Sequence, residues 1–281
     1  MKQTIAISLL LLGFVPKLFT QPFTDVVRLM HAAPISREAV GYEPWSRLNV
    51  QAGVQVLGPH YFLVSYNASR RVLESTFWES TEHPNVLENG LALGAYILPT
   101  DKPWRLQVFG RIQFNGQYTD GDWPDLQPAV LGVYQRKVNP RLLLGAGMYY
   151  ARQLFGNFFI PIVDVQWQVG ERTHLNLRIP QKGQLHYTLR EKRWAAGAWF
   201  ESTIQSYNLA VAVADHLKSS EICAGPFLEF MPFPSLALRL EPTLFLLQQL
   251  EWQDAAGNPI VSEERPTTAY FRVGMHYRVW Q

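Results

Sequence analysis

WRLQVFGRIQFNGQY, residues Trp104 to Tyr118, decides the fold, because apolar and polar side chains alternate along it with the single exception of Phe109. One set of alternate positions is apolar: Trp104, Leu106, Val108, Ile112 and Phe114. The other set is polar: Arg105, Gln107, Arg111, Gln113, Asn115 and Gln117. Successive side chains of a β-strand point to opposite faces, so this stretch predicts one extended strand between an apolar environment and water.

The same alternation recurs to the end of the chain. Candidate strands are 45–57, 61–68, 91–97, 104–118, 126–137, 141–153, 159–169, 174–179, 185–190, 194–207, 222–231, 236–246 and a final strand after 265, thirteen in all. A barrel with both termini on the periplasmic side needs an even number of strands. We therefore expect about 12 strands, with Trp45–Leu57 or the short pair around Gln181 as the surplus.

The width of such a barrel fixes which face meets lipid. A dozen strands enclose a lumen too wide for apolar side chains to fill, so the apolar faces must point outward into hydrocarbon and the polar faces inward. The predicted fold is all-β, an antiparallel up-and-down transmembrane β-barrel with short periplasmic turns and longer external loops. The joints expected to be long are 69–88, 118–125, 154–158, 208–220 and 253–265.

The N-terminal residues are typical of an exported protein. Lys2 precedes an apolar run from Ile5 to Val15, which is too short for a membrane-spanning helix of about 20 residues and is typical of a secretory signal. We expect a signal peptide over residues 1–20, a periplasmic or luminal segment over 21–44 and the barrel over 45–281. The single cysteine, Cys223, has no partner for an intramolecular disulfide and is expected to be a small buried apolar residue.

Composition excludes some classes of function. The formal net charge is +2, with 25 Lys and Arg against 23 Asp and Glu, which argues against the concentrated basic face of a nucleic-acid-binding protein. Aromatic residues make up 13% of the chain, and transmembrane barrels carry such residues in girdles at both membrane interfaces. No His-Glu-x-x-His spacing is present, so neither a metal nor another cofactor is expected.

The last strand resembles the C-terminal assembly signal of outer-membrane barrels. Its pattern is a polar residue, a glycine and two hydrophobic residues at fixed spacing, filled here by Arg272, Gly274, Tyr277 and Val279. The chain departs from that pattern at its end, because Gln281 follows Trp280 where such barrels usually stop at an aromatic residue. The resemblance implies recognition by the barrel assembly machinery.

The mature chain as a whole also resembles uncharacterised outer-membrane β-barrels common in Bacteroidota, a family of unknown function. The segments that carry this resemblance are Leu91-Ala92-Leu93-Gly94, Leu144-Gly145-Ala146-Gly147, the eight residues Trp194 to Glu201, and Phe227-Leu228-Glu229-Phe230. The resemblance implies the fold and a location in the cell outer membrane, with outer-membrane lipid as a partner. It implies no substrate.

Placing the polar face of each strand inward gives the candidate lumen-lining residues. They are Arg105, Arg111, Asp164, His174, Arg178, His186, Arg190, Glu201, Glu229, Arg239, Glu241, Arg272, His276 and Arg278. One interpretation is a network of ion pairs across neighbouring strands, because unpaired charges in a confined lumen are costly. The other is a selectivity lining, which would favour anions since arginine outnumbers carboxylate. The two interpretations are compatible if the bore is open.

Two other classes of protein compete with a passive barrel. An outer-membrane hydrolase would pair a histidine with a serine nucleophile, and the candidates are His174, His186 and His276 with Ser202 or Ser206. No Gly-x-Ser-x-Gly motif is present, and we expect no enzyme. A soluble periplasmic β-barrel ligand carrier shows the same alternation but has shorter strands. We expect a pore or structural barrel; the transported solute and the oligomeric state stay open.

Overall fold

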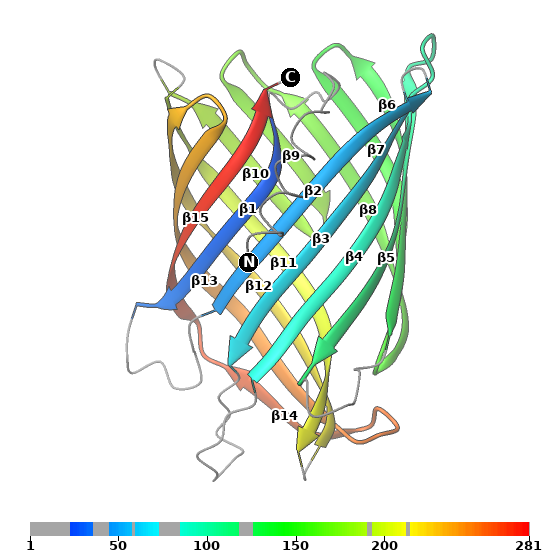
Figure 1. Ribbon diagram of the computed structural model, residues 1–281, viewed down its shortest axis with the longest axis vertical. Coiled ribbons are helices and arrows are strands. Elements are labelled where there is room, and N and C mark those ends of the chain that lie inside the picture. The colour runs from blue at the N-terminus through cyan, green and yellow to red at the C-terminus, as the bar shows by residue number, and fades with distance from the viewer. Residues whose placement is uncertain are drawn as a thin grey trace, which may run out of the picture.

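The computed structural model describes residues 23–35, 45–57, 60–72, 85–117, 126–189, 193–211 and 214–280, and the predicted signal peptide lies outside these ranges. The described residues form fifteen strands, most of them tilted around one barrel (Figure 1). The strands are β1 (Phe23–Pro34), β2 (Trp45–Leu57), β3 (His60–Val72), β4 (Asn85–Ile97), β5 (Trp104–Gly116), β6 (Gln127–Asn139), β7 (Leu142–Gln153), β8 (Gly156–Gln168), β9 (Thr173–Ile179), β10 (Lys182–Thr188), β11 (Trp194–Val211), β12 (Ala214–Phe233), β13 (Leu236–Gln253), β14 (Pro259–Arg265) and β15 (Thr268–Trp280). No helix in the described ranges has the length and apolarity needed to cross a membrane.

The barrel closes between its first and last strands. β1 pairs antiparallel with β15 from Phe23 opposite Trp280 to Pro34 opposite Tyr270, and each of the other strands pairs with its neighbour in the chain. β14 and β15 pair with successive parts of β13, so β14 continues the line of β15 and takes no separate place in the wall. The structure is therefore an all-β, closed antiparallel barrel, as predicted, with fourteen strands in place of about twelve.

The error in the strand count lies at the N-terminus. The structure forms strands at all thirteen candidate positions, including Trp45–Leu57, and adds β1 within the segment 21–44 that we expected to precede the barrel. The alternation does not reveal β1, because three of its inward side chains, Val26, Met30 and Ala32, are apolar and buried. Adding β1 restores the even number that the topology requires.

The predicted assignment of faces is confirmed. Val108 and Leu238 are 39% and 43% exposed on the outer surface, whereas the neighbouring Arg239 is 3% exposed inside the barrel. The outer surface thus presents leucine, valine and aromatic side chains over most of the strands, and most buried charged and amide side chains face the interior. A closed sheet with this distribution is the form in which β-strands cross a bilayer.

Two joints predicted as loops, 208–220 and 253–265, are largely strand, and a third, 154–158, shortens to a turn at residues 154–155. We name the barrel end that carries Trp280 the proximal end and the other the distal end; β11, β12 and β13 have 18, 20 and 18 residues and extend furthest at the distal end (Figure 1). The expected loop 208–220 is a β11–β12 hairpin that stays paired as far as Val211 and Ala214. The expected loop 253–265 shortens to residues 254–258 because β14 pairs back onto β13.

Two adjacent strands are unusually short. β9 and β10 have seven residues each, and their hairpin turns at residues 180–181, level with Val163 on β8 and Glu201 on β11. Further toward the distal end β11 crosses to the other side of the barrel, where Asn208 pairs with Gly116 of β5. A Cβ atom at position 116 would lie 2.5 Å from the Asn208 carbonyl oxygen, so this crossing needs glycine.

Candidate functional site

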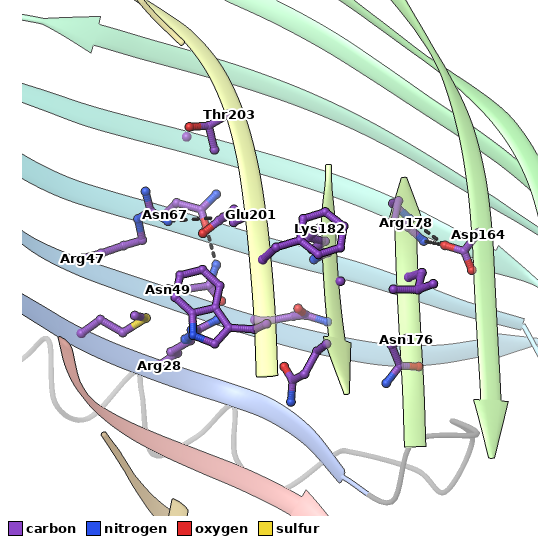
Figure 2. Close-up of a pocket in the computed structure, with 18 of the residues that line it drawn as sticks. Arg28, Arg47, Asn49, Asn67, Asp164, Asn176, Arg178, Lys182, Glu201 and Thr203 are labelled. Carbon is purple, nitrogen blue, oxygen red and sulfur yellow. Dashed lines mark hydrogen bonds and ion pairs between the residues drawn. The ribbon is translucent and has the colours of Figure 1, made fainter. Parts of the chain in front are cut away.

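The barrel encloses a cavity of about 630 Å³, which we call the central cavity. Its walls come from β1 to β5, β8 to β11, β13 and β15, and Figure 2 shows side chains of these walls pointing into the same space. Eight of the lining side chains are basic: Arg28, Arg47, Arg105, Arg111, Arg178, Lys182, Arg239 and Arg278. Three are acidic: Glu88, Asp164 and Glu201. The central cavity is therefore strongly biased toward positive charge.

An amide and arginine network forms one proximal wall of the central cavity. Asp164 of β8 accepts hydrogen bonds from Gln135 Nε2 at 2.5 Å and from Arg178 Nε at 2.7 Å. Arg178 also donates to Gln107 at 2.8 Å, and Arg105 donates to Gln135 at 2.6 Å. Hydrogen bonds to ionised groups are the strong ones, so this network holds five strands, β5, β6, β8, β9 and, through backbone pairing, β7, in one arrangement.

A second network lies between β10, β12, β13 and β15. Both terminal nitrogens of Arg278 donate hydrogen bonds to the carboxylate of Glu229, which is fully buried. Glu229 Oε1 also lies 3.8 Å from His186 Nε2. Glu241 lies 2.5 Å from Arg239 Nε and 3.1 Å from Arg272 Nε. Each buried charge thus has an opposite charge beside it, as burial demands.

Packed apolar side chains close the distal end of the described barrel. We call this cluster the distal plug; its members are Val86, Tyr207, Leu209, Ala214, Leu217, Leu250 and Trp252. Beside it Arg71 donates to both oxygens of Glu221 at 2.6 and 3.0 Å, and Tyr207 donates to Glu88 at 2.6 Å. Together with the crossing of β11 onto β5, the distal plug separates the central cavity from the distal rim.

Three basic side chains of the central cavity have no carboxylate within 4 Å among the described residues. Arg105 is hydrogen-bonded to the amides of Gln135 and Gln166, and Arg111 to the Tyr149 hydroxyl at 2.8 Å. Lys182 is exposed at the tip of the β9–β10 hairpin, between Glu201 on β11 and Arg178 on β9 in Figure 2. These three are the charges that a bound anion would neutralise.

The other basic side chains around the cavity are paired. Arg47 lies 3.7 Å from Glu201 and 4.0 Å from Glu88, and Figure 2 draws the Arg47–Glu201 contact. Arg28 lies 3.8 Å from Glu241. These contacts neutralise much of the lining, so the excess charge is concentrated at Arg105, Arg111 and Lys182.

Of the fourteen candidate lumen-lining residues, the structure describes thirteen and places them inside the barrel. Nine line the central cavity: Arg105, Arg111, Asp164, His174, Arg178, His186, Glu201, Arg239 and Arg278. Glu229, Glu241, Arg272 and His276 lie in the β10–β15 network instead. Arg190, also expected inward, lies outside the described residues. Of the assembly-signal positions on β15, Arg272 and Gly274 face inward, and Tyr277 is partly exposed on the outer face.

Several residues that line the central cavity are absent from the candidates named from the sequence. Arg28 lies on β1, which shows no alternation, and Glu88 lies in a stretch expected to be a loop. Arg47 sits on the predicted strand 45–57, whose alternation already placed it on the polar face, whereas Lys182 falls in the joint expected between 174–179 and 185–190. The alternation in 45–57 was therefore enough to predict that Arg47 lines the lumen, whereas no pattern in the sequence predicted this for Arg28.

Ser206 is one of the two candidate serine nucleophiles of a hydrolase. The Ser206 hydroxyl contacts the side-chain oxygens of Gln127 and Gln153 at 3.1 and 2.7 Å and accepts a hydrogen bond from the backbone N–H of Leu154 at 3.0 Å. Within the described ranges no cluster of three or more His, Cys, Asp or Glu is suited to a metal ion.

Neither a family model nor a curated protein matches the chain. Solved structures with a similar fold include a Pseudomonas aeruginosa FadL homologue, 10% identical over 89% of both chains with a TM-score of 0.48. They also include the KdgM porin, 11% identical over 89% of this chain and 97% of that chain with a TM-score of 0.37. LpxR from Salmonella typhimurium is 8% identical over 89% of this chain and 99% of that chain with a TM-score of 0.38. These likenesses concern the fold alone.

Proposed function

We propose that this protein is an outer-membrane barrel that passively transports small anionic solutes through its central cavity, without catalysis and without a cofactor. The observation that carries the proposal is the charge of that cavity, in which eight basic side chains face three acidic ones. Charged linings bias which solutes enter a confined aqueous space. The packed distal plug favours a narrow, solute-binding path over a wide general pore.

The location and the route of assembly belong to the same proposal. An apolar outer surface, a polar interior and a signal-like N-terminus support insertion into the outer membrane. The spacing of Arg272, Gly274, Tyr277 and Val279 supports delivery by the barrel assembly machinery. We keep nucleic acid outside the proposed partners, since a formal net charge of +2 argues against a concentrated basic face.

Ion selectivity tests the proposed function. We expect the purified protein, reconstituted in a planar bilayer, to show a reversal potential in a KCl gradient that indicates preference for chloride. Arg111→Glu and Lys182→Glu should each lower the chloride-to-potassium permeability ratio by about twofold or more, because each reverses an uncompensated charge in the lining. The reversal potential is the measurement.

The matched control is Arg136→Glu, which reverses an exposed charge on the outer face of β6 and should leave the ratio unchanged. Equal preference for both ions in the wild type, or equal responses of all three variants, would contradict an anion path through the cavity. Complete absence of ion flux would contradict transport itself.

A further inference from the structure

The wall of the barrel is incomplete beside the β9–β10 hairpin. β8 pairs with β9 only over Val163 to Gln168, and β10 pairs with β11 only as far as Glu201, with one more backbone bond from Ser202 N–H to Gln181. Beyond these points no described strand lies between residues 156–162 of β8 and residues 203–205 of β11. We call this space the wall window.

The wall window is closed again at its distal side. The Ser206 N–H donates to Gln153 and the Ser206 carbonyl accepts from Gln127, so two side-chain amides replace a missing strand. Lys218 Nζ of β12 lies 5.1 Å from the centre of the Phe155 ring in the β7–β8 turn. The wall window is therefore a bounded gap in the strand pairing, about three residues or ~10 Å long along β11.

The wall window lies at the same level along the barrel as the apolar, lipid-facing part of the outer surface. On the β8 side Phe159 and Val163 are 65% and 52% exposed, and on the other side Ile204 and Ile222 are each 38% exposed. Unpaired strand edges do not face hydrocarbon unless they line a protein-walled or water-filled cavity. The free edge of β8 also carries Pro161, a residue found at sheet edges because it has no N–H to donate.

Just inside the wall window the lumen is apolar. Leu131, Val133 and Ile162 form a buried cluster, and Phe109, Tyr149 and Ile160 pack against it. This apolar strip ends at Arg111, which is hydrogen-bonded to the Tyr149 hydroxyl and lines the central cavity. Lys182 stands on the proximal lip of the window. An apolar surface thus leads to two cations that have no carboxylate within 4 Å among the described residues.

We infer that the wall window passes a single-chain anionic amphiphile between the membrane and the central cavity, with its alkyl chain on the Leu131–Ile162 strip and its headgroup at Arg111 and Lys182. The occupant follows from charge and shape, because a neutral chain would leave both cations unpaired and a small anion would leave the apolar strip exposed to water. This inference rests on the proposed function, since it names the class of anion that the same cavity takes.

The opening is tested with a lipid-phase quencher. In a Cys223→Ala background, Thr203→Cys places a bimane label at the window and Gln51→Cys places one on the intact opposite wall; both positions line the central cavity. We expect nitroxides on the acyl chains of the vesicle lipids to quench the label at 203 several-fold more than the label at 51. Equally weak quenching at the two positions would overturn the lateral opening.

The occupant is tested with the same labelled protein and three probes. Dodecanoate should shift the emission of the label at 203 at concentrations about a hundredfold below butyrate, because the longer chain buries more apolar surface, and dodecanol should give no shift. Ile162→Glu should abolish the response to dodecanoate, and the milder Ile162→Ala should weaken it by about tenfold if the first variant does not fold.

The outcomes separate this inference from the proposed function. Equal potency of dodecanoate and butyrate, together with chloride selectivity in bilayers, overturns the amphiphile and leaves the anion path. A dodecanoate response without any ion flux supports the wall window and overturns passive ion transport.

Discussion

Glu229→Ala is expected to lower the free energy of unfolding by about 3–5 kcal/mol, because the substitution leaves buried cations without their counter-charge. Glu229 is fully buried, accepts two hydrogen bonds from Arg278 and lies 4.0 Å from Arg239. Urea titration of the protein refolded in lipid vesicles, followed by tryptophan fluorescence, measures the change. Glu229→Gln keeps the shape of the side chain and should cost less.

The control for this prediction is Glu251→Ala on β13. Glu251 lies 3.3 Å from Lys218 Nζ, and its side chain is 18% exposed. A partly solvated pair of this kind contributes about 0–1 kcal/mol. Similar losses for Glu229→Ala and Glu251→Ala would show that the buried network does not stabilise the barrel.

Trp252→Ala is expected to have the second large effect, on both stability and passage. Trp252 is fully buried in the distal plug, and truncating a buried tryptophan costs about 3–5 kcal/mol. The space left behind lies between the central cavity and the distal rim, so the single-channel conductance should rise above that of the wild type. Urea titration and planar-bilayer recording measure the two effects.

Leu246→Ala on the same strand gives the matched comparison, because Leu246 is 53% exposed on the lipid-facing surface. It should leave the conductance unchanged and have a smaller effect on stability. If Trp252→Ala destabilises the protein without raising the conductance, the distal plug does not limit passage.

Strand faces were predictable from the sequence, and the content of the lumen was predictable only in part. Alternation placed Arg111 and Asp164 inside and Val108 outside, because one side of each wall strand meets lipid. We assumed that apolar side chains cannot fill the interior of so wide a barrel, and this assumption holds only for part of the interior. Apolar clusters lie inside the barrel, one of them around Trp45, Trp199 and Phe227.

The reason is the shape of the barrel. β11 crosses to β5, so the distal interior is narrower than a round fourteen-stranded barrel and side chains can fill it. That crossing depends on contacts distant in sequence, such as Asn208 with Gly116, which no local pattern reveals. β1 was not predicted for a related reason. Its inward residue Met30 is apolar and packs against the same aromatic residues that fill the lumen, so the strand lacks a polar face.

The polar stretch 208–220 was predicted as a loop but is largely strand. Ser219 and Glu221 resemble loop residues, yet they face inward on β12, where the Ser219 hydroxyl donates to Glu221 at 3.0 Å. Strands that extend past the apolar belt have no lipid to face, so the alternation that marks the rest of the barrel disappears there.

The backbone hydrogen bonds between β1 and β15 have a consequence for the rate of folding. The residues that they join, such as Phe23 and Trp280, stand at opposite ends of the described chain, so these bonds form only after nearly every residue has been synthesised. Ring closure over such a separation carries a high entropic cost and slows folding. Closure of the barrel therefore depends on both terminal strands, and a lesion in either one would stall an otherwise sound polypeptide with an unsealed edge.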